Sequence, residues 1–137
     1  MVIFLDCDGV INQLQPNYYI DEACVKILGD IVDKLDASVV LSSTWRVGFL
    51  HNYDMCTPQI QKLRDVFEKY NIECIGRTKN IGDRQKEIEV YVKDHDIKDF
   101  LVLDDDKNEF HDMTNLYLVK SQTGLTKKDY KAITRLK

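Results

Sequence analysis

VIFLDCDGV, at residues 2–10, is the segment that most constrains the structure of this chain. Four apolar residues lead directly into two carboxylates, Asp6 and Asp8, and then into Gly9. So short an apolar run, bounded by a turn residue, predicts a buried strand of a parallel sheet. Asp6 and Asp8 would then lie just past the C-terminal end of that strand, where open α/β sheets bind ligands.

Two carboxylates this close together repel each other, so either one holds a proton or a cation lies between them. A hard divalent cation with oxygen ligands, Mg²⁺ above all, is the first candidate. The purely structural alternative is a strand followed by an acidic turn, in which Gly9 supplies a positive φ.

The rest of the chain alternates between helical and strand-like patterns. Helices are predicted over residues 21–35 and 58–70, from Asp83, and after Thr126, where Thr126 and Asp129 are spaced as a capping box. Further strands are predicted at residues 39–41, 72–75, 100–103 and 116–119. This alternation predicts a single α/β domain over residues 1–137, with a parallel sheet layered by helices.

Composition excludes several classes of protein. The chain is 44% apolar and 31% charged, and no window approaches the length of a membrane span. There is no signal peptide pattern and the four cysteines are scattered, so we expect reduced thiols and a cytoplasmic protein without a membrane partner. The net charge is −4, yet residues 120–137 carry six basic residues and one acidic residue. That segment either helps to hold a polyanion or forms a solvated helix face.

Polar side chains follow three of the predicted strands. They are Asp6 and Asp8, then Ser42, Ser43 and Thr44, and finally Asp104, Asp105 and Asp106. In a parallel sheet these strand ends face one crevice. Arg84 and Lys86, at the start of the helix before the fourth strand, add positive charge. Carboxylates, hydroxyls and a cation together suit phosphoryl transfer with Mg²⁺.

These segments resemble the four motifs of the haloacid dehalogenase (HAD) superfamily. Residues 6–10, DCDGV, resemble its first motif, and residues 39–42, VVLS, its second. Arg84 or Lys86 resembles the basic residue of the third motif, and residues 101–105, LVLDD, the fourth. Details at residues 42–46 and 124–126 look most like the small HAD domains of Swiss Army Knife RNA-repair proteins. The resemblance implies a three-layer, Rossmann-like fold with a five-stranded parallel sheet of order 3-2-1-4-5.

The resemblance also implies a mechanism for phosphate ester hydrolysis. Asp6 would be the nucleophile that forms an aspartyl-phosphate, and Asp8 the general acid and base. Ser42 and Arg84, or Lys86 in its place, would contact the phosphoryl oxygens. Mg²⁺ would be held by Asp6, by the backbone carbonyl of Asp8, and by Asp105 with Asp104 beside it. Ser43, Lys86, Trp45 and Arg46 are the candidate substrate-binding residues; Trp45 and Arg46 either clamp a base or sugar or simply pack.

Neither interval between the motifs has room for a separate cap domain, so the site should be open. An open site suits a large phosphorylated substrate such as a nucleotide or an RNA or DNA end, and equally suits nonspecific hydrolysis of small phosphates. The main alternative is a noncatalytic module that binds Mg²⁺ and phosphate and works through a partner. A phospho-accepting receiver domain fits less well, because its acidic pair and its acceptor aspartate lie on different strands.

Overall fold

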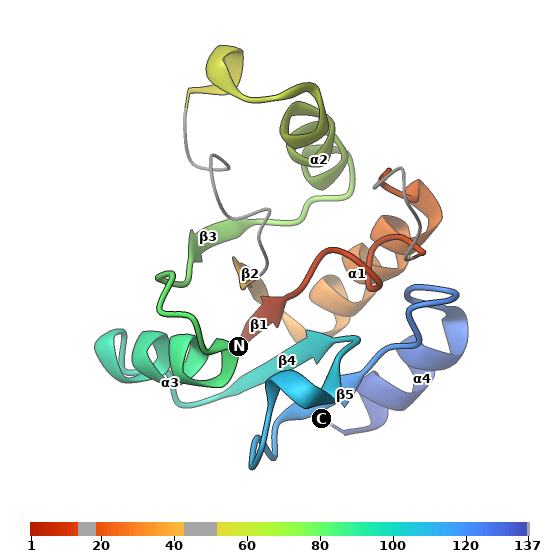
Figure 1. Ribbon diagram of the computed structural model, residues 1–137. Coiled ribbons are helices and arrows are strands. Elements are labelled where there is room, and N and C mark those ends of the chain that lie inside the picture. The colour runs from red at the N-terminus through yellow and green to blue at the C-terminus, as the bar shows by residue number, and fades with distance from the viewer. Residues whose placement is uncertain (14–18, 43–51, 137) are drawn as a thin grey trace.

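Five parallel strands form one sheet in the computed structural model, which describes residues 1–13, 19–42 and 52–136 (Figure 1). The strands are β1 (Val2–Leu5), β2 (Ser38–Leu41), β3 (Cys74–Arg77), β4 (Phe100–Asp104) and β5 (Leu116–Leu118). Their order is β3-β2-β1-β4-β5, as predicted, so β1 is central and pairs with both β2 and β4.

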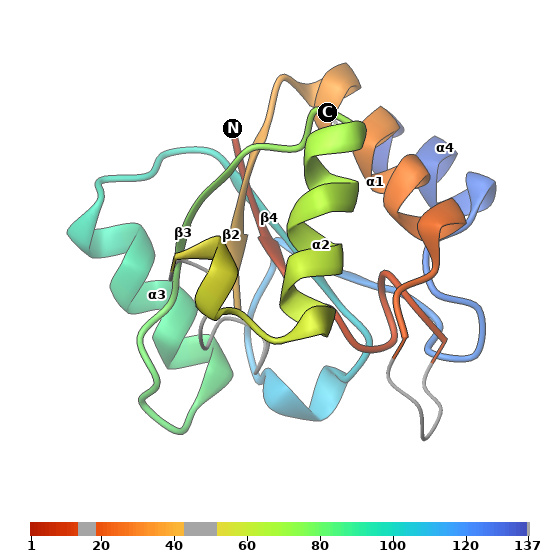
Figure 2. The same cartoon turned by 90° about the horizontal axis from the view of Figure 1, so that it is seen from above.

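The helices of the described residues cover both faces of the sheet. They are α1 (Glu22–Leu35), α2 (Pro58–Lys69), α3 (Arg84–Asp94) and α4 (Lys127–Arg135), with short 3₁₀ turns η2 (Tyr53–Met55) and η3 (Lys107–Glu109). Figure 2 shows α3 on one side of the strands and α1, α2 and α4 on the other. The three-layer, capless single domain predicted from the sequence is therefore confirmed. None of these helices has the length and apolar character needed to cross a membrane.

Alternation of side chains along the strands divides the core in two. On the α3 face, fully buried Phe4 makes edge-to-face contacts with Tyr91 and Phe100, with ring centroids 5.6 Å away in both cases. The opposite face holds the larger cluster, which includes Ile3, Leu5, Val39, Leu41, Leu101 and Leu103. Burial of a side chain of this size stabilises the fold by roughly 1.5–3 kcal/mol, so β1 is held firmly from both faces.

The third strand differs from its prediction by two residues. It was expected at residues 72–75 with a loop from Gly76, but β3 runs from Cys74 to Arg77. Glycine suits position 76 within this edge strand, because the Tyr91 hydroxyl occupies the space where a Cβ of that residue would lie. The pairing with β2 is irregular, because Val39 pairs with Cys74 and Val40 with Gly76, which leaves one extra residue in β3.

Candidate active site

Three aspartates meet at the carboxyl edge of the sheet. Leu5 of β1 pairs with Leu103 of β4, so the next residues, Asp6 and Asp104, lie side by side, and the Asp6 amide donates a hydrogen bond to the Leu103 carbonyl at 3.0 Å. Carboxylate oxygens of Asp6, Asp104 and Asp105 all lie within 4.8 Å of one another. Asp6 is 5% exposed and Asp104 is fully buried, whereas Asp105 is half-buried. We refer to these three residues as the acidic cluster.

Arg84 supplies the positive charge beside the acidic cluster. Its Nη1 atom lies 2.8 Å from Oδ2 of Asp104 and 3.3 Å from Oδ1 of Asp6. Asp83 fixes the start of α3, because its side chain accepts a hydrogen bond from the Lys86 amide. Residues two apart on a helix point in different directions, and the Lys86 side chain is exposed. The sequence left two candidates for the phosphate-facing cation, Arg84 and Lys86. The structure brings Arg84 to the acidic cluster.

Burial sets the electrostatics of these groups. It raises the pKa of the Asp6 carboxyl well above its usual range, and the nearby Asp104 adds to the rise while Arg84 opposes it. Burial likewise raises the pKa of Asp104, again against the effect of Arg84. Burial alone would lower the pKa of Arg84, but Asp6 and Asp104 outweigh it and leave that pKa raised. One guanidinium thus balances the charge of only part of the cluster, and a further cation would favour its ionised form.

The acidic cluster fits a hard divalent cation. It offers oxygen ligands only, from two adjacent strands, at a separation that one ion can bridge. Three carboxylates beside a single arginine also leave net negative charge to attract a cation. The donor set therefore suits Mg²⁺ as the sequence predicted.

The Asp8 side chain is not one of the three grouped carboxylates and lies in a turn built around Asn12. The Asn12 side-chain amide donates to Oδ1 of Asp8 at 3.2 Å, and its carbonyl oxygen accepts from the Gly9 amide at 2.8 Å. Asn12 is 1% exposed, so its side chain is shielded from water. The sequence analysis missed this residue, and the only available signal was a turn-forming asparagine three positions after Gly9.

Gly9 lies directly against the acidic cluster. Its φ is +84°, and a Cβ placed there would come within 2.6 Å of Cγ of Asp105. A side chain at this position would therefore push the Asp105 carboxylate away from its neighbours.

The Gly9→Ala variant is expected to lose about 2 kcal/mol of unfolding free energy or more and to bind Mg²⁺ ~10–100-fold more weakly. Gly82→Ala is the matched control, because Gly82 has a φ of +96° with no atom within 4 Å of its Cβ position. It should lose only the backbone contribution, about 1 kcal/mol. Urea unfolding and calorimetric titration with Mg²⁺ measure both effects, and equal Mg²⁺ affinities in the two variants would contradict the steric explanation.

Ser42 directly follows β2, the strand next to the one that Asp6 follows. Its amide donates to the Leu5 carbonyl at 3.0 Å, and its side chain is fully buried. The structure thus places Ser42 at the same sheet edge as the acidic cluster. The other predicted residues of this segment, Ser43, Trp45 and Arg46, lie outside the described residues.

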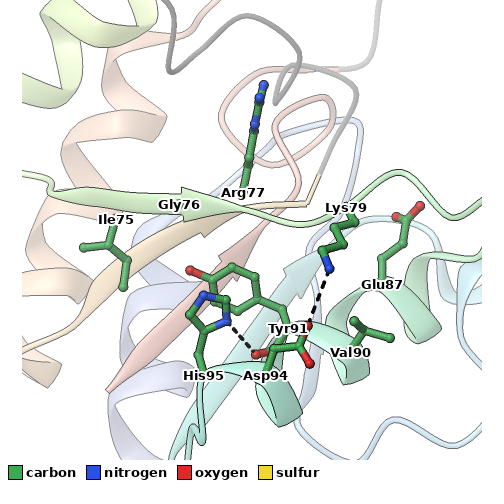
Figure 3. A pocket seen from close by; sticks show the side chains of 9 residues that line it. All are labelled: Ile75, Gly76, Arg77, Lys79, Glu87, Val90, Tyr91, Asp94 and His95. Carbon is green, nitrogen blue, oxygen red and sulfur yellow. Dashed lines mark hydrogen bonds and ion pairs between the residues drawn. The ribbon is translucent and has the colours of Figure 1, made fainter.

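Glu87 holds the loop that leads into α3. Its Oε2 atom accepts hydrogen bonds from the amides of Ile81 and Gly82, at 2.7 and 3.0 Å, and the residue is 3% exposed. Figure 3 shows Glu87 at one end of a pocket of about 240 Å³ between β3 and α3. Because Arg84 lies one turn earlier on α3, Glu87 helps to fix the position from which Arg84 reaches the cluster.

The Glu87→Ala variant is expected to lose about 1–3 kcal/mol of unfolding free energy, because two backbone amides lose a buried, charged acceptor. Glu89→Ala, on the exposed side of the same helix, should change stability by less than about 0.5 kcal/mol. Urea unfolding of both variants tests this difference. Equal stability would show that the loop does not depend on the carboxylate.

Gln85 makes a second connection from α3. It is 1% exposed, its carbonyl oxygen accepts from the His111 amide at 2.9 Å, and its amide nitrogen contacts the Asp112 carboxylate. It therefore ties α3 to the segment that follows η3. Neither Gln85 nor the loop contacts of Glu87 were predicted, since both depend on partners that sequence pattern does not reveal.

The sheet order, together with acidic residues after its central strand and after the neighbouring β4, defines a HAD-type α/β domain. The chain belongs to the family described as the HAD domain in Swiss Army Knife RNA repair proteins, which matches residues 2–130. HAD-domain families are typically phosphohydrolases. No curated protein and no solved structure matched the chain.

Proposed function

We propose that this chain is a Mg²⁺-dependent phosphomonoester hydrolase that acts through an aspartyl-phosphate on Asp6. Its substrates would be nucleic-acid ends, nucleotides or other large phosphorylated molecules. The observation that carries the proposal is the position of Arg84, whose guanidinium contacts Asp6 and Asp104 while Asp105 lies within reach of both acids. The residues proposed as nucleophile, metal ligands and phosphate-facing cation therefore lie together in one small site.

In the first step, a carboxylate oxygen of Asp6 attacks the phosphorus and the bond to the leaving oxygen breaks. Asp8 donates a proton to that oxygen, so the alcohol leaves in neutral form. In the second step Asp8 takes a proton from water as the water oxygen attacks the phosphorus. The bond to Asp6 then breaks, which releases inorganic phosphate and restores both aspartates.

The remaining residues act on the charge and position of the phosphoryl group. Arg84 would neutralise its oxygens and reduce their repulsion from Asp6, and the Ser42 hydroxyl would donate a hydrogen bond to them. Mg²⁺ held by the acidic cluster and the Asp8 carbonyl would withdraw charge from the phosphoryl oxygens. Asn12 would position Asp8, since it binds that carboxylate and the adjacent Gly9 amide. Lys86, Ser43, Trp45 and Arg46 remain proposed contacts for more distant parts of the substrate.

The proposed substrate class follows from the open site and from the family. A domain without a cap leaves the carboxyl edge of the sheet accessible to a large molecule, and the family occurs in RNA repair proteins. We also propose that residues 1–137 form one phosphatase domain and that the protein is cytoplasmic. The cytoplasmic location is supported by the four cysteines, none of which forms a disulfide.

Hydrolysis of p-nitrophenyl phosphate, with Mg²⁺ or with EDTA, tests the reaction. We expect turnover with Mg²⁺ and none with EDTA. A panel of RNA, DNA and nucleotides carrying 5′- or 3′-phosphates then defines the substrate. If Mg²⁺ binds but no phosphate ester is hydrolysed, the chain is instead a binding module that works through a partner.

A further inference from the structure

A groove of about 470 Å³ lies between the edge strand β5 and the start of α4. Three exposed lysines, Lys120, Lys127 and Lys128, line it together with the half-exposed Leu118. Figure 1 shows β5 and α4 next to each other at the end of the sheet opposite β3. We call this surface, formed by residues of 117–129, the lysine groove.

The lysine groove has a net positive charge within an acidic protein. Asp129 is the only carboxylate among its lining residues, and neighbours already bind it: the Tyr117 hydroxyl donates to it at 2.7 Å and the Thr126 amide at 2.8 Å. Within the described part of the chain, none of the three lysines forms an ion pair with a carboxylate. Their charges therefore face solvent without a protein counter-ion.

The pocket between β3 and α3 offers a contrast. There Lys79 lies 3.7 Å from Asp94, and the two basic residues of the lining, Arg77 and Lys79, are matched by Glu87 and Asp94 (Figure 3). The lining of that pocket has no net charge, so it offers no net electrostatic attraction to a polyanion.

The lysine groove begins at the sheet edge that carries the candidate active site. The amide of Val119, one residue before Lys120, donates to the Asp104 carbonyl at 2.9 Å. The turn that follows Lys120 binds the loop after Asp8, because the Leu125 amide donates to the Val10 carbonyl at 2.7 Å. Lys120 therefore starts the groove at the same sheet edge as the acidic cluster.

We propose that the lysine groove binds the backbone phosphates of a single-stranded nucleic acid whose terminal phosphate is hydrolysed at the acidic cluster. This inference rests on the proposed function. A peptide with one phosphate would place that phosphate in the active site, and no phosphate would remain for the three lysines. A polynucleotide carries a phosphate at every nucleotide and can contact both. Leu118 and the ring of Tyr117 offer apolar surface for a base.

Fluorescence anisotropy with a labelled oligonucleotide of ~12 nucleotides, lacking a terminal phosphate and kept in EDTA, measures binding apart from hydrolysis. The variant combines Lys120→Gln, Lys127→Gln and Lys128→Gln. Its control combines Lys34→Gln, Lys93→Gln and Lys98→Gln, which are exposed near the amino ends of the strands, away from the acidic cluster. Of these three, Lys98 pairs with Asp96 at 2.8 Å. The groove variant should fold normally, since lysines at the first two positions of α4 oppose the helix dipole.

We expect the groove variant to bind RNA at least ~tenfold more weakly than wild type, with a slope of log K against log salt that is smaller by about 2. The control should bind like wild type. DNA of the same sequence separates general backbone binding from a preference for RNA. Absence of wild-type binding, an equal loss in the control, or tighter binding of a multiply phosphorylated peptide would each overturn the inference.

Hydrolysis of p-nitrophenyl phosphate separates this inference from the proposed function. None of the residues that line the groove belongs to the acidic cluster, so the groove variant should retain wild-type turnover of this small substrate. If the wild-type protein fails to hydrolyse the small substrate yet binds RNA through the three lysines, the hydrolase is rejected and the groove remains supported.

Discussion

Replacement of Asp6 by asparagine is expected to abolish Mg²⁺-dependent hydrolysis of p-nitrophenyl phosphate, with a loss of at least ~10³-fold in kcat. Asparagine keeps the size of the side chain but removes the oxygen that would attack phosphorus. Burial and the neighbouring Asp104 raise the pKa of the Asp6 carboxyl, which means that its charged form is disfavoured in the folded protein. A neutral asparagine at this position should therefore not weaken the fold. Initial rates and urea unfolding of the same preparation separate lost chemistry from lost structure.

Asp106→Asn is the matched control for this substitution. Asp106 lies beside the acidic cluster but uses its carboxylate to accept a hydrogen bond from the Asn108 amide at 3.0 Å, where it caps η3. Asparagine is an equally good cap, so this variant should retain its rate within about twofold. Wild-type turnover by a folded Asp6→Asn protein would reject Asp6 as the nucleophile.

The Arg84→Met variant is expected to lose ~10²–10³-fold in kcat. A single guanidinium nitrogen contacts both Asp6 and Asp104, and this cation would also offset the charge of the phosphoryl oxygens. Because one nitrogen makes both contacts, Arg84→Lys should recover part of the rate. Steady-state kinetics of the two variants measure the loss and the recovery.

Lys86→Met is the control for the Arg84 variants, since Lys86 lies on the same turn with an exposed side chain. We expect its kcat for p-nitrophenyl phosphate to stay within about twofold of wild type. A greater loss for Lys86→Met than for Arg84→Met would reverse the assignment of the phosphate-facing cation.

Much of the fold could be predicted because its signals are local. The apolar run at residues 2–5 and the acids that follow it identify β1 and its functional end without any knowledge of distant partners. Capping residues were equally informative: Asp21, Asp83 and Thr126 are each the N-cap of a helix in the structure. The contact between Arg84 and the acidic cluster could be predicted for the same reason. Arg84 is the first residue of α3, and Asp6 and Asp104 lie at the ends of β1 and β4, so local signals locate all three residues.

What the sequence did not reveal depends on partners far along the chain. Gln85 binds residues 111 and 112, and no local pattern marks a glutamine for burial against them. The predicted bounds of β3 were wrong because Gly76 is a typical loop residue in sequence. Only the structure shows that the Tyr91 hydroxyl occupies the space beside it, so that a glycine suits this strand position. Asn12 resembled any loop asparagine, and only the folded turn shows that it binds Asp8 and Gly9.

The central place of β1 also determines when the site can be completed during translation. β1 is synthesised first, but its neighbour β4 is made only after β2, β3 and their helices. The nascent chain can pair β3, β2 and β1 while Asp6 still lacks Arg84, Asp104 and Asp105. Any polypeptide released before Asp105 carries the proposed nucleophile without the cluster around it, so under the proposed function we expect a prematurely terminated chain not to hydrolyse phosphate esters.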